Sequence, residues 1–127
     1  MTKLLVIGLG GFLGAVARYG LSTFANRMHG GPFPVGTLLV NVLGCLIIGG
    51  FVFLVEERSH FSEHTRHFFL IGVLGSLTTF STFGNETIGL LRNHSLAHAF
   101  GNVLANLALC LAAVLLGRAV VRWVVTT

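Results

Sequence analysis

The stretch Val35-Gly-Thr37-Leu-Leu-Val-Asn41-Val-Leu-Gly44-Cys-Leu-Ile-Ile-Gly-Gly-Phe-Val-Phe-Leu-Val55 contains no charged residue. A membrane-spanning helix needs about 20 mostly apolar residues to cross about 30 Å of hydrocarbon, and this stretch meets that requirement. Three more apolar segments of similar length follow or precede it, which predicts four spans at about 4–24, 35–55, 68–91 and 99–123. Residues 1–127 are therefore expected to form a single four-helix transmembrane domain.

The composition of the whole chain supports this interpretation. Of the 127 residues, 54% are hydrophobic and only 9% are charged, whereas about 25% of the residues of a soluble domain are charged. Eight Lys and Arg stand against four acidic residues, and they are spread along the chain. Nucleic-acid binders gather their basic residues in a patch or stripe. We therefore predict a protein surrounded by membrane lipid, with no nucleic-acid partner.

The basic residues carry a weak topology signal. An even number of spans places both chain ends on one side of the membrane. One side would carry Lys3, Arg58, Arg66 and Arg122, and the other Arg27 and Arg92. This bias is small for a rule that counts Lys and Arg in short loops. Insertion in both orientations, and an inverted dimer of identical chains, are therefore compatible with the sequence.

The third span has an unusual centre, Gly75-Ser-Leu-Thr78-Thr79-Phe80-Ser81-Thr82-Phe83-Gly-Asn-Glu86. Glycine and clustered hydroxyl side chains weaken a helix. Unwound backbone is tolerated at membrane depth only where it is buried in protein or lines water, so we expect this helix to be broken near its centre. Freed carbonyls at a break can bind a cation, and the start of the next half-helix favours an anion. The alternative is an unbroken packing helix rich in Ser and Thr.

Polar side chains recur at four-residue spacing in two other spans. They are Thr37 and Asn41 with Gly44 in the second span, and Asn102, Asn106 and Cys110 in the fourth. Such side chains usually face the bundle or a water-filled path, although a single Asn is often only a hydrogen bond between helices. Because three of the four spans have polar stripes, we interpret Thr37, Asn41 and Asn106 as candidate pore residues.

Two phenylalanines stand beside hydroxyl side chains in the third span. The edge of an aromatic ring carries positive charge density, so Phe80 and Phe83 turned edge-on could contact an anion without trapping it. A conducting site must bind well enough for entry and weakly enough for release. Asn41 can add amide donors, and Ser81 and Thr82 hydroxyl donors. This combination favours an anion path.

The remaining motifs say less about function. Cys45 and Cys110 lie in apolar runs, where thiols behave as small hydrophobes, so we predict neither a disulfide nor a metal site for them. The run His60-Phe-Ser-Glu63-His64 matches an H-x-x-E-H zinc pattern, but it falls in a short connection without room for a substrate cleft. A pore of neutral donors offers no nucleophile and no general base, and we predict no catalytic activity.

These segments resemble the Fluc (CrcB) family of bacterial fluoride channels over nearly the whole chain. The resemblance rests on Gly10-Gly-Phe-Leu-Gly14-Ala-Val-Ala-Arg18-Tyr19, Gly36-Thr-Leu-Leu-Val-Asn41-Val-Leu-Gly44 and Gly75-Ser-Leu-Thr-Thr-Phe-Ser-Thr-Phe83. It implies an all-α membrane protein with four transmembrane helices per subunit and a broken third helix. It also implies an antiparallel, dual-topology homodimer with two pores in the bacterial inner (plasma) membrane, which exports cytoplasmic fluoride passively and confers fluoride resistance.

The same resemblance implies roles for individual residues. Phe80 and Phe83 would face fluoride, Asn41 would be the pore amide, Ser81 and Thr82 would line the ion path, and Arg18 would be a vestibule charge. A structural Na⁺ at the centre of the dimer would be bound by the backbone carbonyls of Gly75 and Thr78. Relatives have serine and tyrosine at some polar positions of the fourth span, where this chain has Asn102, Asn106 and Cys110. Glu86 follows the break and would be a vestibule or interface residue, to which the resemblance assigns no specific role.

Three other functions compete with the channel. A small multidrug exporter has a similar architecture but needs a Glu in its first span, and the first acidic residue of this chain is Glu56. A proton-coupled fluoride antiporter would need an acidic proton carrier in a span, for which Glu86 is the candidate. A non-conducting assembly subunit would use its polar residues only to hold helices together.

Overall fold

The computed structural model describes residues 1–57 and 61–127, and every element in this part of the chain is helical. The elements are α1 (Thr2–His29), α2 (Val35–Glu57), α3 (Glu63–Arg66), the π-helix η1 (His67–Leu74), α4 (Gly75–Leu77), α5 (Phe80–Arg92) and α6 (Leu96–Thr126). Arg58, one of the topology charges, and His60, the first residue of the H-x-x-E-H run, lie outside the described residues.

Four helical segments are long and apolar enough to cross a membrane. They are Thr2–His29, Val35–Glu57, Glu63–Arg92 and Leu96–Thr126, and the third comprises α3, η1, α4 and α5. Each of them contains one of the four spans expected from the sequence. The prediction of an all-helical chain with four membrane-crossing segments is therefore confirmed.

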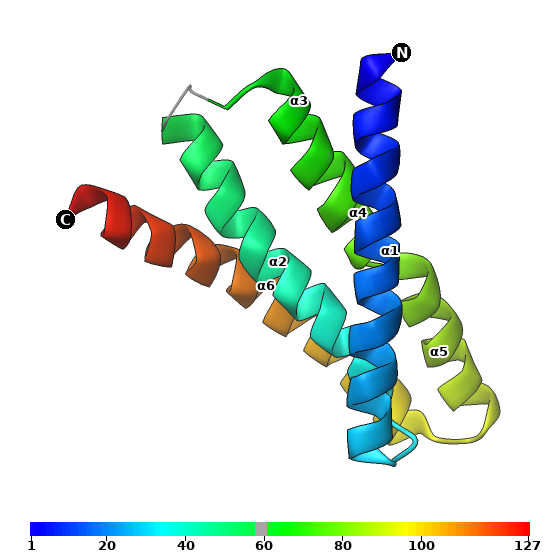
Figure 1. The fold of residues 1–127 in the computed structure, drawn as a ribbon. Coiled ribbons are helices and arrows are strands. Elements are labelled where there is room, and N and C mark those ends of the chain that lie inside the picture. Colours follow the sequence, from blue (N-terminus) through cyan, green and yellow to red (C-terminus); the bar gives the residue numbers. More distant parts are fainter. Residues whose placement is uncertain (58–60) are drawn as a thin grey trace.

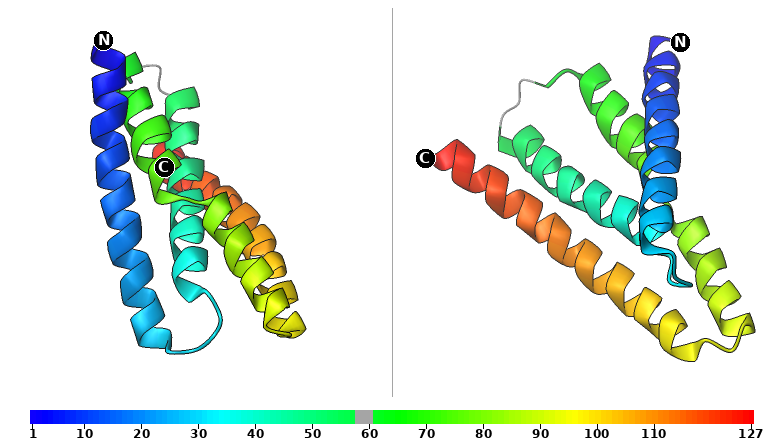
Figure 2. Two further views of the ribbon diagram at one scale, coloured as in Figure 1. Left: turned by 90° about the vertical axis from the view of Figure 1, so that its right-hand side faces the viewer. Right: turned by 60° about the horizontal axis from the view of Figure 1, so that its bottom comes forward.

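Figures 1 and 2 show how these segments are arranged. Helix α1 packs against α2, η1 and α4, whereas α6 packs along α2 and against α5. The N-terminus and the start of α3 lie at one end of the molecule, and the α1–α2 and α5–α6 connections lie at the other (Figure 1). Helices α2 and α6 run in the same direction, so equivalent turns of the two helices lie side by side.

The turn between α1 and α2 is short because both helix ends share one asparagine. Helix α1 ends at Gly30, which has the left-handed φ of 62° that glycine adopts without strain. The N–H of Gly30 donates to the carbonyl of Asn26 (3.1 Å), and the N–H of Gly36 donates to the Asn26 side-chain oxygen (2.8 Å). This closes the hairpin that brings α2 alongside α1.

Glycine lets the helices approach until their backbones touch. A Cβ atom on Gly14 of α1 would collide with the carbonyl of Val73 in η1. On the other side of the molecule, a Cβ on Gly49 would collide with the carbonyl of Val114, and one on Gly117 with that of Leu46. Such small-residue contacts are the usual packing device in membranes, where burial of apolar surface does not drive helices together.

We expect Gly117→Ala to destabilise the packing of α6 against α2. The added methyl group meets backbone, which cannot move aside as a flexible side chain can, and overpacking of this kind costs about 1–3 kcal/mol. Thermal unfolding in detergent measures the change. Gly8→Ala and Gly20→Ala are matched controls, because no atom lies within 4 Å of a Cβ at either position. Equal stability of all three variants would contradict this packing.

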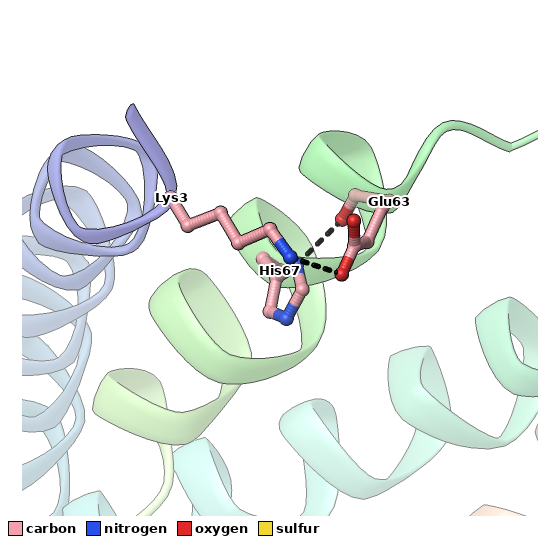
Figure 3. Close-up of polar contacts among 3 residues, drawn as sticks. All are labelled: Lys3, Glu63 and His67. Carbon is pink, nitrogen blue, oxygen red and sulfur yellow. Dashed lines mark hydrogen bonds and ion pairs between the residues drawn. The ribbon is translucent and has the colours of Figure 1, made fainter. Parts of the chain in front are cut away.

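Two ion pairs join helices near the end of the molecule that holds the N-terminus. The Nζ of Lys3 lies 2.6 Å from Oε1 of Glu63, and the Nδ1 of His67 lies 2.8 Å from the Glu63 carbonyl (Figure 3). Arg118 Nη2 lies 2.6 Å from Oε2 of Glu56. All four charged side chains are 41–60% exposed, so each pair contributes about 0–1 kcal/mol.

The single chain leaves much apolar surface uncovered. Its fully buried hydrophobic cluster is small and consists of Val40, Leu74 and Leu77. Large side chains such as Phe12 and Leu104 are about two-thirds exposed. Such surface is stable only against lipid or against another apolar protein surface.

Candidate functional site

The third membrane-crossing segment is interrupted at Thr78 and Thr79. Helix α4 ends at Leu77, and the next two residues are extended, with φ/ψ of −85°/154° at Thr78 and −152°/118° at Thr79. Helix α5 then begins at Phe80 with Thr79 as its N-cap, whose hydroxyl accepts a hydrogen bond from the N–H of Thr82 (3.2 Å). A threonine N-cap of this kind is a strong local signal for a helix start.

Asn41, in the middle of α2, binds the backbone of this interruption. The N–H of Thr79 donates to Oδ1 of Asn41 (2.8 Å), and Nδ2 of Asn41 donates to the carbonyl of Thr79 (3.2 Å). One side-chain amide thereby satisfies both backbone groups of Thr79, much as a neighbouring strand would. Because both residues are buried, leaving these groups unpaired would cost about 1–3 kcal/mol each.

The interruption leaves the carbonyls of residues 75–78 without the N–H partners of an unbroken helix, and Gly75 and Thr78 are two of these residues. In an unbroken helix the N–H of Thr79 would bind the carbonyl of Gly75, and the N–H of Thr82 would bind that of Thr78. Here the first donates to Asn41 and the second to the hydroxyl of Thr79. The carbonyls of Gly75 and Thr78 have therefore lost their helical partners, and these are the two groups that the family resemblance implies as cation ligands.

A chain of hydrogen bonds continues from Asn41 across α6 and back to α5. Asn41 Nδ2 donates to Asn106 Oδ1 (3.0 Å), and Asn106 Nδ2 donates to Asn102 Oδ1 (2.9 Å). Asn102 Nδ2 donates to Thr87 Oγ1 (2.9 Å), and that hydroxyl donates to the carbonyl of Phe83 (2.8 Å). The three amides are buried, with Asn102 fully so. The polar stripes on α2 and α6 thus form one network that fixes α5 after the interruption.

Two hollows share Thr79 as a lining residue. The first has a volume of about 380 Å³ and is bounded by α2, α6 and the interrupted segment. Among the predicted site residues it is lined by Asn41, Gly75, Thr78, Phe80, Phe83 and Asn106. The second has a volume of about 250 Å³ and lies between α1, α2 and the start of α5. It is lined by the predicted residues Arg18, Thr37 and Thr82.

The two phenylalanines have opposite environments although their rings touch. Their centroids are 5.3 Å apart and the ring planes are inclined by 55°. Phe83 is only 8% exposed, whereas Phe80 is 79% exposed. The ring of Phe83 is therefore packed inside the subunit, whereas the ring of Phe80 lies on its surface.

Glu86 lies one helical turn beyond this region and binds Thr37. The Thr37 hydroxyl donates to Oε1 of Glu86 (2.8 Å). Within the described part of the chain, the other carboxylate oxygen is buried and has no hydrogen-bond partner. Glu86 also lines a third hollow of about 420 Å³ near the α1–α2 turn. Glu86 therefore occupies a polar position between two hollows.

Most of the predicted site residues are brought together, with one exception. Ser81 is exposed and lines neither of the first two hollows, although its hydroxyl lies 3.2 Å from that of Thr79. Three residues outside the predicted set belong to the site, namely Thr79, Asn102 and Thr87. Thr79 could have been found as a threonine directly before a helix start. Asn102 is on the recognised stripe, and nothing in the sequence distinguishes Thr87.

The described residues contain no group of three or more His, Cys, Asp or Glu side chains that could hold a metal ion. What they do contain is a set of neutral donors and acceptors inside a bundle of membrane-crossing helices. This combination defines a multi-pass membrane protein with a buried polar site at an interrupted helix.

Comparison with known proteins identifies the family. The chain matches the sequence profile of the family described as CrcB-like protein, Camphor Resistance (CrcB), over residues 5–118. It is 48% identical over 118 residues to the fluoride-specific ion channel FluC of Shewanella frigidimarina (strain NCIMB 400), which covers 93% of this chain and 94% of that protein. It is 47% identical over 121 residues to FluC of Shewanella baltica (strain OS185), with 95% and 97% covered. The chain belongs to the CrcB family, and the resemblance noted from its motifs is confirmed.

Proposed function

We propose that this chain is the subunit of a fluoride-selective, passive ion channel. The relatives are named for fluoride-specific conduction, which is not an enzymatic activity. The observation that carries the proposal is the pairing of Asn41 with Thr79, because it holds open an interruption whose residue Thr79 lines two hollows. Interrupted helices in membranes are tolerated where they line such a path.

The ion path would use weak donors around the interruption. Phe80 and Phe83 offer ring edges, and the hydroxyls of Ser81 and Thr82 offer hydrogen bonds to a small anion. Arg18 on the second hollow supplies the positive charge that attracts the anion without standing at the narrowest point. The N–H groups of Asn41 are already engaged, so its main role would be to hold the interruption, and it would donate to the ion only by releasing a partner.

A second copy of the chain would complete each pore. In the single subunit Phe80, Ser81 and Thr82 are exposed although they lie in a membrane-crossing segment. Hydroxyl groups at this depth need protein or water around them, since lipid tails cannot bind them. An antiparallel homodimer would cover these side chains and create two equivalent pores. The weak charge bias of the loops is compatible with such dual topology.

The freed carbonyls fit a sodium ion at the centre of this dimer. Hard cations prefer oxygen ligands, and the carbonyls of Gly75 and Thr78 have no helical N–H partners. One chain supplies two of these oxygens, and an inverted second chain would supply two more. A bound cation would provide a fixed positive charge that joins the two interruptions.

The proposed location and direction of flow follow from passive conduction. The protein would lie in the bacterial inner membrane, and fluoride would leave the cytoplasm down its electrochemical gradient. A narrow path lined by neutral donors can replace the water shell of the small fluoride ion while larger halides do not fit.

A proton-coupled antiporter is the second candidate, because Glu86 has a buried carboxylate oxygen to which residues 1–57 and 61–127 offer no hydrogen-bond partner. Such a group can carry a proton in a membrane protein. Its hydrogen bond with Thr37, which lines the second hollow, supports a position near the proposed path. In a channel the same residue would only position Thr37.

Fluoride efflux from liposomes that contain the purified protein decides between these functions. A potassium ionophore relieves the membrane voltage, and chloride efflux is the control. We expect rapid fluoride release, negligible chloride release and no need for a proton gradient. Release that requires a proton gradient would support the antiporter, and no release from a folded dimer would support the assembly subunit.

A further inference from the structure

We propose that Cys45 and Cys110 form a two-thiol site for a soft, thiophilic d10 cation, and that the bound cation closes the first hollow. The sequence alone gave no reason to pair these residues, because each lies in an apolar run. The pairing arises from the register of α2 against α6. The proposed cation site does not depend on the proposed channel function. The proposal that the bound cation closes the hollow to fluoride does rest on that function.

The register places the two cysteines opposite each other. Asn41 of α2 binds Asn106 of α6, which is 65 residues further along the chain. Gly49 meets the backbone of Val114, with the same separation. Cys45 and Cys110 also share this separation and lie midway between the two contacts, one turn from each. Because the helices run in the same direction, the thiols must lie in the same layer of the interface.

Burial and the lining of the first hollow agree with this register. Both cysteines are free and both are only partly buried. Both line the hollow of about 380 Å³ that also contains Asn41, Phe83 and Asn106. The site is therefore open to the space through which fluoride is proposed to pass.

The chemistry of the pair selects the ligand. Among the described residues that line the hollow there is no carboxylate and no imidazole. Two sulfur ligands in such a place suit soft cations that accept two-coordinate geometry, such as cuprous, silver and mercuric ions. With Hg²⁺, both S–H bonds break, two S–Hg bonds form and two protons leave to the buffer, without any change of oxidation state. The product is neutral, which matters because an uncompensated charge is costly in apolar surroundings.

Mercuric chloride is the probe for a binding test on the whole protein. The protein is reduced and desalted before titration, and bound mercury is measured by elemental mass spectrometry with proton release followed in parallel. We expect one Hg²⁺ per chain and two protons released. The complex should resist roughly 100-fold more competing monothiol than either Cys45→Ser or Cys110→Ser, because the second sulfur binds intramolecularly.

Two further variants isolate the role of the pair. Cys45→Ser/Cys110→Ser removes every cysteine of the chain and should bind no mercury under thiol competition. Cys110→Ser/Leu109→Cys keeps two thiols per chain but moves one to a half-exposed position next to the native one, and it should behave like a single-cysteine variant. Two Hg²⁺ per wild-type chain, or equal resistance to monothiol in all cysteine-containing forms, would overturn the site. Helical content by circular dichroism verifies that each variant is folded.

The closure is tested on fluoride efflux from liposomes. Mercuric chloride should reduce efflux through the wild type by at least roughly tenfold and leave the cysteine-free variant unaffected. Mercury bound at one per chain with undiminished efflux would overturn the closure. Absence of efflux before mercury is added would instead count against the proposed function, and the binding stoichiometry would still decide the site.

Discussion

Asn41→Leu is expected to abolish fluoride efflux and to destabilise the subunit. Leucine has nearly the same size but cannot bind the N–H or the carbonyl of Thr79, both of which are buried. Two unsatisfied backbone groups together cost about 2–6 kcal/mol. The interruption should then collapse or rearrange, and the two hollows that Thr79 lines should change shape. Liposome efflux and thermal unfolding in detergent measure the two effects.

Controls separate this role from a general effect of losing an asparagine. Asn93→Leu makes the same change at an exposed position at the end of α5 and should leave efflux and stability near wild type. Asn41→Asp retains an oxygen acceptor for the N–H of Thr79 but loses both donors, and it should rank between the wild type and Asn41→Leu in stability. Wild-type efflux from Asn41→Leu would mean that the interruption does not depend on this amide. Loss of efflux with an intact dimer would count against the assembly-subunit function.

Phe80→Ile and Phe83→Ile are both expected to reduce fluoride efflux but to differ in stability. Isoleucine keeps much of the apolar volume and removes the positive ring edge. If the contact between a ring edge and fluoride stabilises the ion at the highest barrier of the path by about 1.5 kcal/mol, its loss lowers the rate of fluoride passage roughly tenfold. Phe83 is buried in the subunit, so its replacement also leaves a cavity and should lower the unfolding temperature. Phe80 is exposed in the single chain, so its replacement should chiefly weaken the proposed dimer.

Phe100→Ile is the matched control for this pair. Phe100 is 66% exposed on α6 and does not line the first hollow. We expect efflux through this variant to equal that of the wild type. Unchanged efflux in both Phe80→Ile and Phe83→Ile would make the edge-on contact untenable, whatever their stability.

Much of the candidate site was accessible from the sequence because its residues recur with helical spacing. Thr37 and Asn41, and likewise Asn102 and Asn106, are four residues apart, and each pair lies on one helix face. Their partners were not accessible. That Asn41 binds Thr79 rather than lining a pore with free donors depends on contacts across 38 residues of chain. Spacing within one helix contains no information about the rotation of its neighbour.

The cysteines illustrate the same limit. Local composition described Cys45 and Cys110 correctly as residues of apolar helices. Their pairing follows from the parallel course of α2 and α6 and from the glycine contact one turn away. A one-residue change in that register would turn the thiols about 100° apart on their helices and leave no site.

The sequence by itself determined the membrane-spanning character, the number of spans and the family. These depend on the length of uncharged segments and on short local motifs, because transfer into lipid is a sum over the residues of each segment. Only the tertiary structure decided how Asn41 satisfies Thr79, which carbonyls are freed and which thiols meet. These depend on helix register at glycine contacts, where backbone-to-backbone packing sets which side chains face each other.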